Sequence, residues 1–117
     1  MKTRNRICEL LIDRTNIPLP NLRLPDRGYT LPAVAAVRDH MENFAVRPYK
    51  AEIADCDNRA LLLTAHFSGL GYAFGWASIG THDICVFVSA REEVWYVEPS
   101  TCVIYPPDVP LTWLVMP

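Results

Sequence analysis

Three residues of this chain could together form a nucleophile, a base and a group that orients the base: Cys56, His82 and Glu98. A helix is expected to begin near Cys56, because Asp55 and Asp57 beside it favour the N-terminal end of a helix. The partial positive charge at such an end favours thiolate over thiol. A carboxylate beside a histidine fixes the orientation of the ring and stabilises its protonated form. These residue types therefore predict nucleophilic catalysis by a cysteine, provided that the fold brings them together.

One β-hairpin decides whether His82 and Glu98 meet. Residues 84–88 and 94–98 are predicted strands, and residues 89–93 are the turn between them. In this register His82 lies diagonal to Glu98 on one face of the sheet, whereas a turn of two or four residues would separate them. The helix beginning near Cys56 has a stripe at positions 56, 60, 63 and 67. If that helix covers the face with His82, the three side chains converge.

The remaining pattern predicts an α+β domain. Helices are expected over residues 3–14, 32–44 and 56–69, and the proline-rich stretch 17–32 should be extended along the surface. Strands are expected over residues 72–79, 84–88, 94–98, 103–105 and 111–116. Residues 1–117 therefore form one domain, with a helical and extended part over 1–44 and the Cys56 helix plus a small antiparallel sheet over 45–117.

Two stretches carry a resemblance to a known family. The run from Pro48 to Ala60, PYKAEIADCDNRA, and the run from Val94 to Thr101, VWYVEPST, are similar to the cysteine and glutamate segments of a papain-like family. That family is typified by the C-terminal domain of a mushroom agglutinin and has relatives in bacteria and phages. The resemblance covers about residues 45–105. It implies a papain-like fold with N-terminal helices packed on the sheet, and it implies Cys56 as nucleophile, His82 as base and Glu98 as the orienting residue.

Some positions depart from the family pattern and support a different function. Asn58 and Arg59 replace an aspartate and a phenylalanine, Ser100 replaces a glutamine, and Thr81 precedes His82 in place of glycine. The sequence contains no glutamine that could stabilise an oxyanion, although backbone N–H groups at the start of the Cys56 helix could do so. The alternative is a catalytically eroded papain-like binding module, for example a phage or mobile-element protein that inhibits a host protein complex.

Three further residues are candidates for substrate binding: Asp57, Trp76 and Trp95. Asp57 would tune the site, and either tryptophan would form a wall of a groove near the thiol. Their more ordinary roles are helix capping for Asp57 and core packing for the two tryptophans.

Composition limits the partners. The 117 residues are 50% hydrophobic with a net charge of −2, and they contain neither a basic stripe for nucleic acid nor a segment that spans a membrane. We therefore expect a cytoplasmic protein whose four cysteines are reduced and whose partner is a peptide or protein substrate or a protein ligand. Neither a CxxC nor an HxxxH spacing occurs, so no metal and no cofactor are expected.

Overall fold

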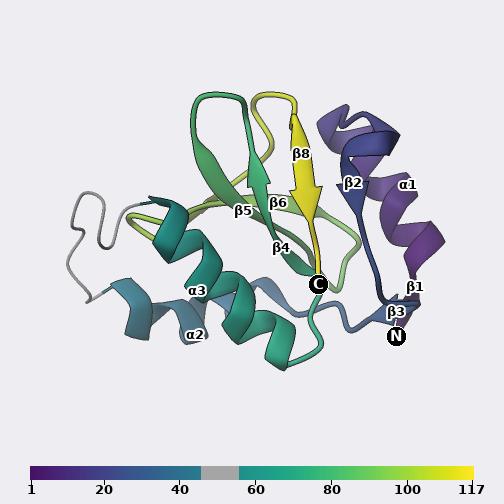
Figure 1. The fold of residues 1–117 in the computed structure, drawn as a ribbon. Helices are drawn as coiled ribbons and strands as arrows, with labels where there is room; N and C mark the ends of the chain where they lie inside the picture. The colour runs from purple at the N-terminus through teal and green to yellow at the C-terminus, as the bar shows by residue number, and fades with distance from the viewer. Residues whose placement is uncertain (46–55) are drawn as a thin grey trace.

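This computed structural model describes residues 1–45 and 56–117, with side chains for residues 1–42 and 57–117. The described chain is α+β, with helices on both faces of a mixed sheet (Figure 1). The helices are α1 (Arg4–Thr15), α2 (Val34–Ala45) and α3 (Cys56–Gly69), with a short 3-10 turn at Leu19–Asn21. The strands are β1 (Lys2–Thr3), β2 (Leu22–Arg23), β3 (Gly28–Tyr29), β4 (Phe74–Ser78), β5 (Asp83–Val88), β6 (Val94–Glu98), β7 (Val103–Tyr105) and β8 (Trp113–Val115).

The main sheet has six strands in the order β2-β8-β4-β5-β6-β7, and β1 pairs separately with β3. The β5–β6 hairpin has the register expected from the sequence, with Val88 opposite Val94 and Cys85 opposite Val97. The expectation of a purely antiparallel sheet is wrong, because β2 pairs with β8 in parallel. The N-terminal part, expected only to extend along the surface, thus supplies an edge strand. A strand of two residues within a proline-rich stretch is too short to produce a detectable alternation.

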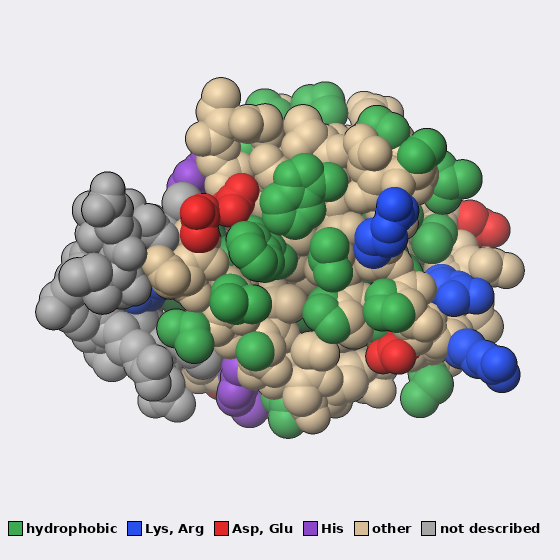
Figure 2. Space-filling view, in the orientation of Figure 1, with side chains coloured by type: hydrophobic (Ala, Val, Ile, Leu, Met, Phe, Trp, Pro, Cys, Tyr) green, Lys and Arg blue, Asp and Glu red, His purple; other side chains and the backbone are tan. Residues whose placement is uncertain are grey.

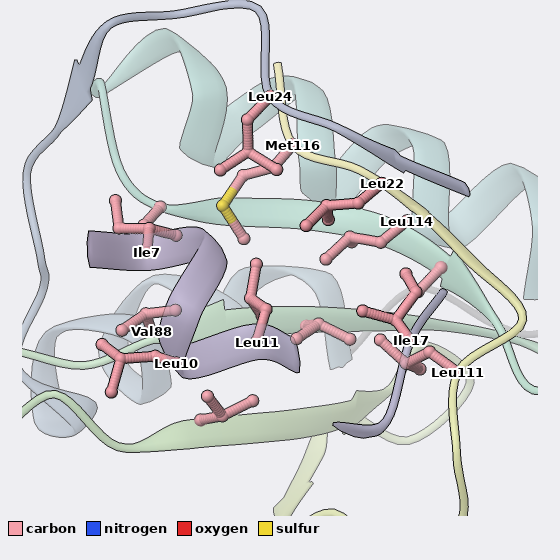
Figure 3. Packing of buried hydrophobic residues seen from close by; sticks show 14 of the residues in the cluster. Ile7, Leu10, Leu11, Ile17, Leu22, Leu24, Val88, Leu111, Leu114 and Met116 are labelled. Carbon is pink, nitrogen blue, oxygen red and sulfur yellow. The ribbon is translucent and has the colours of Figure 1, made fainter. Parts of the chain in front are cut away.

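The two faces of the sheet are covered by different helices. Helix α1 packs Ile7, Leu10 and Leu11 against a face that includes Val86 and Tyr96, and Figure 3 shows its apolar side chains directed into this core. Helices α2 and α3 cover the opposite face. Their buried residues and the strand residues that they contact are Val37, Met41, Ala60, Leu63, Phe67, Phe74, Cys85, Phe87 and Val97.

Helix α3 therefore does not cover the face that carries Ile84, Val86 and Val88. That is the face on which the sequence pattern required it to pack for Cys56, His82 and Glu98 to converge. The physical reason is that β5 is buried on both faces. A strand with apolar residues at consecutive positions does not reveal which helix packs on which face. The stripe on α3 is confirmed for its described members, since Ala60, Leu63 and Phe67 are buried.

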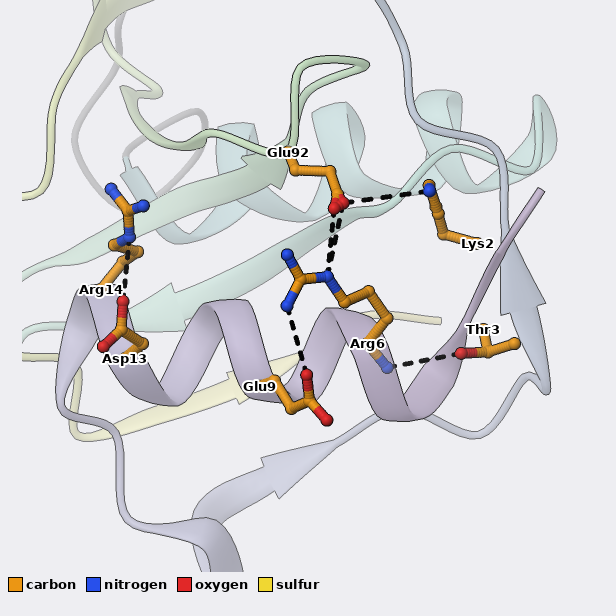
Figure 4. A network of polar contacts seen from close by, with 7 residues as sticks. All are labelled: Lys2, Thr3, Arg6, Glu9, Asp13, Arg14 and Glu92. Atoms are coloured by element: carbon orange, nitrogen blue, oxygen red, sulfur yellow. Dashed lines mark hydrogen bonds and ion pairs between the residues drawn. The ribbon is translucent and has the colours of Figure 1, made fainter.

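Charged side chains attach α1 to the turn between β5 and β6. Nε of Arg6 lies 3.0 Å from Oε1 of Glu92 in that turn, and Nη1 of Arg6 lies 3.2 Å from Oε2 of Glu9 on its own helix (Figure 4). Nζ of Lys2, on β1, lies 3.9 Å from Oε2 of Glu92. The hydroxyl of Thr3 caps α1 by accepting from the backbone N–H of Arg6 at 3.4 Å. None of the helices in the described part of the chain has the length and apolar character needed to cross a membrane.

Candidate functional site

The centre of the candidate site is a histidine–carboxylate pair at the ends of two neighbouring strands. His82 directly precedes β5, Glu98 is the last residue of β6, and Nε2 of His82 lies 2.7 Å from Oε2 of Glu98. The second carboxylate oxygen, Oε1, accepts hydrogen bonds from the backbone N–H and the hydroxyl of Ser100 at 3.2 and 2.8 Å. The side chain of Glu98 is thus held at both oxygens. Such a carboxylate fixes the imidazole ring of His82 in one orientation.

The first turn of α3 reaches the start of β5 through two acidic residues. The side chains of Asp57 and Asp83 share a hydrogen bond, and Oδ2 of Asp83 also accepts from the indole N–H of Trp76 at 3.1 Å. Burial, together with this contact to Asp57, raises the pKa of the Asp83 carboxyl above its ordinary value. Asp83 is the first residue of β5 and directly follows His82. The contact therefore places the beginning of α3 at the start of β5, next to the histidine in the chain.

A buried arginine makes a second connection from the same turn of α3. Arg59 is 5% exposed, and its Nε donates to the carbonyl oxygen of Pro99 at 2.6 Å. Its guanidinium also hydrogen bonds the thiol of Cys102. Pro99 directly follows Glu98, so Arg59 connects the start of α3 to the end of β6. The sequence pattern did not predict this hydrogen bond, although the position of Arg59 beside the apolar stripe of α3 indicated a buried contact.

The predicted nucleophile, Cys56, is the first residue of α3, and its side chain lies outside the described residues. Through Asp57 and Arg59, the first turn of the Cys56 helix contacts Asp83 and Pro99, which are the chain neighbours of His82 and Glu98. Trp76 joins this group through its bond to Asp83.

Trp95, the other predicted wall of the groove, lies elsewhere along the sheet. It precedes Glu98 by three residues on β6, which is about 10 Å along a strand. It packs against the core beneath α2 and α3, and its buried indole N–H has no hydrogen-bond partner among the described residues. The structure therefore does not bring Trp95 into contact with the histidine–carboxylate pair.

The cysteines whose side chains are described are unsuited to act as thiolates. Cys8, Cys85 and Cys102 are free thiols, and burial raises the pKa of each of them. Cys85 is enclosed completely, with its sulfur 3.6 Å from the carbonyl oxygen of Ala60 on α3. These three thiols are expected to react slowly with electrophiles at neutral pH.

Comparison with known proteins supports the resemblance at the level of the fold. No family model matches the sequence, and no curated protein matches it. Among solved structures, the chain is similar to that described as the PSL1a–E64 complex, with a TM-score of 0.73 and 16% identity over 97% of this chain and 50% of the other. It is also similar to the Polyporus squamosus lectin bound to the human-type influenza-binding epitope Neu5Aca2-6Galb1-4GlcNAc, with a TM-score of 0.63 and 18% identity over 89% of this chain and 44% of the other.

The chain thus spans about half the length of these lectin structures. At such identities the likeness concerns the fold alone. The fold of this chain resembles part of a mushroom lectin, in agreement with the similarity to a mushroom agglutinin that the sequence segments indicated.

Proposed function

We propose that this chain is a small papain-like cysteine hydrolase that cleaves a peptide or amide bond, with Cys56 as nucleophile, His82 as base and Glu98 as the residue that orients His82. The observation that carries the proposal is the 2.7 Å contact between Nε2 of His82 and Glu98 at strand ends to which the Cys56 helix is connected. Asp57 and Arg59 make those connections, through Asp83 and Pro99.

The contact also assigns the two ring nitrogens of His82. Because Nε2 faces the carboxylate, it carries the proton and donates to Glu98, and Nδ1 is the nitrogen left to exchange a proton with a thiol. The sulfur of Cys56 would attack the carbonyl carbon of the substrate, and backbone N–H groups at the start of α3 would stabilise the oxyanion. Protonated His82 would then give its proton to the leaving amine, which departs as the thioester forms. A water molecule, deprotonated by His82, would attack the thioester, release the acid and regenerate the thiol.

One structural neighbour supports a direct test of this chemistry. It is described as a complex with E64. The same reagent is therefore a suitable probe for this chain, beside iodoacetamide as a general thiol reagent.

The experiment is a labelling time course read by intact mass and peptide mapping. We expect one adduct at Cys56 that forms faster than on free cysteine near neutral pH, while the buried thiols react slowly. Cys56→Ser should abolish the fast adduct, Cys102→Ser should leave it unchanged, and His82→Gln should slow it about tenfold or more. If Cys56 reacts no faster than free cysteine and His82→Gln has no effect, the hydrolase proposal is wrong. Turnover is then measured on a peptide library with Cys56→Ser as the blank.

A second candidate is a binding module on the same fold, with a protein or glycan ligand. Its support is the face that α3 shares with β4 and β8, where hydrophobic side chains occupy much of the centre (Figure 2). Leu61 and Leu62 on α3 are 51% and 46% exposed, and Val115 on β8 is 38% exposed. A neighbour on this fold is a lectin bound to a sialylated epitope. Stoichiometric capture of a protein or glycan that is unaffected by Cys56→Ala and weakened by Leu61→Asp would favour this candidate.

A further inference from the structure

Two histidines distant in the sequence meet between α2 and α3, away from the candidate site. Nδ1 of His40 on α2 lies 3.0 Å from Nε2 of His66 on α3. Both side chains are half-buried. The ring centroids are 5.1 Å apart, with the ring planes inclined at 49°.

The two imidazoles are held in place by an aromatic ring of the core. Phe67 is fully buried and makes edge contacts with both, at centroid distances of 5.9 Å to His40 and 5.0 Å to His66. Rings fixed in this way lose little conformational freedom when they bind a ligand together.

We infer that His40 and His66 form a two-nitrogen binding site for a divalent late transition-metal ion, of which Ni²⁺ and Cu²⁺ are the best matched. An imidazole nitrogen binds such metals at about 2.0–2.1 Å. With the two nitrogens 3.0 Å apart, the angle at the metal is about 91–97°. That is the angle between neighbouring ligands in the square-planar and octahedral geometries of these ions. Among the described residues no group of three or more metal-ligating side chains is found, so the described part of the chain supplies two ligands.

The folded chain favours the neutral form of His66. An imidazole binds a metal only when it is neutral. Burial, and next the proximity of His40, lower the pKa of His66 below its ordinary value. Without a metal, one ring donates its N–H to the other across the gap. A metal would replace this contact, and the donating ring would carry its proton on its other nitrogen instead. Binding should weaken in acid, where the imidazoles become protonated.

A bound ion would join two helices whose histidines are 26 residues apart in the sequence. The unfolded chain does not hold these two rings together. Binding should therefore favour the folded state. This effect does not depend on any hydrolase activity of the chain.

The experiment titrates the whole chain with NiCl₂, because Ni²⁺ prefers imidazole and does not oxidise thiols as Cu²⁺ does. Calorimetry should show one ion per chain, and saturating Ni²⁺ should raise Tm by several degrees. His40→Gln and His66→Gln should each weaken binding about tenfold or more. His82→Gln removes the third histidine of the sequence and is the matched control, which should bind Ni²⁺ as the parent chain does.

A measurement on the unmodified chain covers the case in which a variant fails to fold. Ni²⁺ is paramagnetic, so substoichiometric Ni²⁺ should broaden the NMR signals of the His40 and His66 rings before those of His82. The inference is overturned if no saturable binding occurs below about 1 mM Ni²⁺. It is also overturned if His82→Gln is the variant that loses binding, or if His82 broadens first.

Discussion

The Nε atom of Arg59 lies 2.6 Å from the carbonyl oxygen of Pro99, and this hydrogen bond attaches the first turn of α3 to the end of β6. The guanidinium is buried, so the bond is shielded from water. Helix α3 begins at Cys56, three residues before Arg59, and Glu98 directly precedes Pro99. A hydrogen bond between two residues that are not themselves proposed to react therefore sets the distance between the helix start and the His82–Glu98 pair.

Replacing Arg59 by methionine should destabilise the fold and disturb the candidate site. Arg59→Met keeps an unbranched side chain in the buried position but leaves the Pro99 carbonyl oxygen without its donor. We expect the free energy of unfolding to fall by about 1–3 kcal/mol, measured by urea denaturation. Arg91→Met, at an exposed position in the β5–β6 turn, is the control and should stay within about 0.5 kcal/mol of the parent. Equal stability of Arg59→Met and the parent would contradict the role given to this bond.

Ser100 is expected to stabilise the candidate site by holding the carboxylate of Glu98 in place. Ser100→Ala removes the hydroxyl donor to Oε1 of Glu98 but keeps the backbone donor. Stability should therefore decrease by only about 0.5–1.5 kcal/mol. If the hydrolase proposal holds, alkylation of Cys56 should also slow, because the carboxylate is less firmly held, and Ser100→Thr should restore the rate. A Ser100→Ala chain with unchanged stability and an unchanged alkylation rate would show that the contact does not order the site.

The acidic pair at the start of β5 predicts a pH dependence of stability. The pKa of Asp83 is raised in the folded chain, mainly by burial and next by Asp57. Its contribution is fully present below the unfolded pKa and is lost as the pH rises through the folded pKa. Asp83→Asn cannot ionise and still offers an oxygen to the indole N–H of Trp76. Its Tm relative to the parent should therefore be higher at about pH 7 than at about pH 4.

The matched control for Asp83→Asn is Asp39→Asn, at an exposed position on α2. The difference in Tm between Asp39→Asn and the parent should be the same at both pH values. If the difference in Tm between Asp83→Asn and the parent is also the same at both pH values, the raised pKa of Asp83 is refuted.

Two glycines should respond oppositely to the same substitution. Gly75 lies on β4, where an added Cβ would collide with the carbonyl oxygen of Val115 and lie 2.9 Å from Cδ1 of Leu114. Gly75→Ala should cost about 1–3 kcal/mol, because the backbone of β8 must move. At Gly69, the last residue of α3, nothing lies within 4 Å of the added Cβ. Gly69→Ala should therefore change stability by less than about 0.5 kcal/mol, as judged by thermal unfolding of both variants.

The sequence by itself determined the three helices, the strands from β4 to β8 and one long-range contact. Helix periodicity and the residues that end helices predicted α1, α2 and α3, and the length of one turn predicted the register that lets His82 reach Glu98. These predictions succeeded because they depend on residues near one another in the chain. Because side chains alternate between the two faces of a strand, the register of a hairpin then determines which residues of its two strands lie on the same face.

Only the tertiary structure decided which surfaces meet. The face of the sheet under α3, the parallel pairing of β2, the bond from Arg59 to Pro99 and the meeting of His40 with His66 were not foreseen. The last three join residues 26 or more apart in the sequence. The first was not foreseen because β5 is apolar toward both faces, so the local pattern does not show which face a helix covers. The choice is made by the packing of whole elements, because every buried apolar face and every buried polar group must find its partner at the same time.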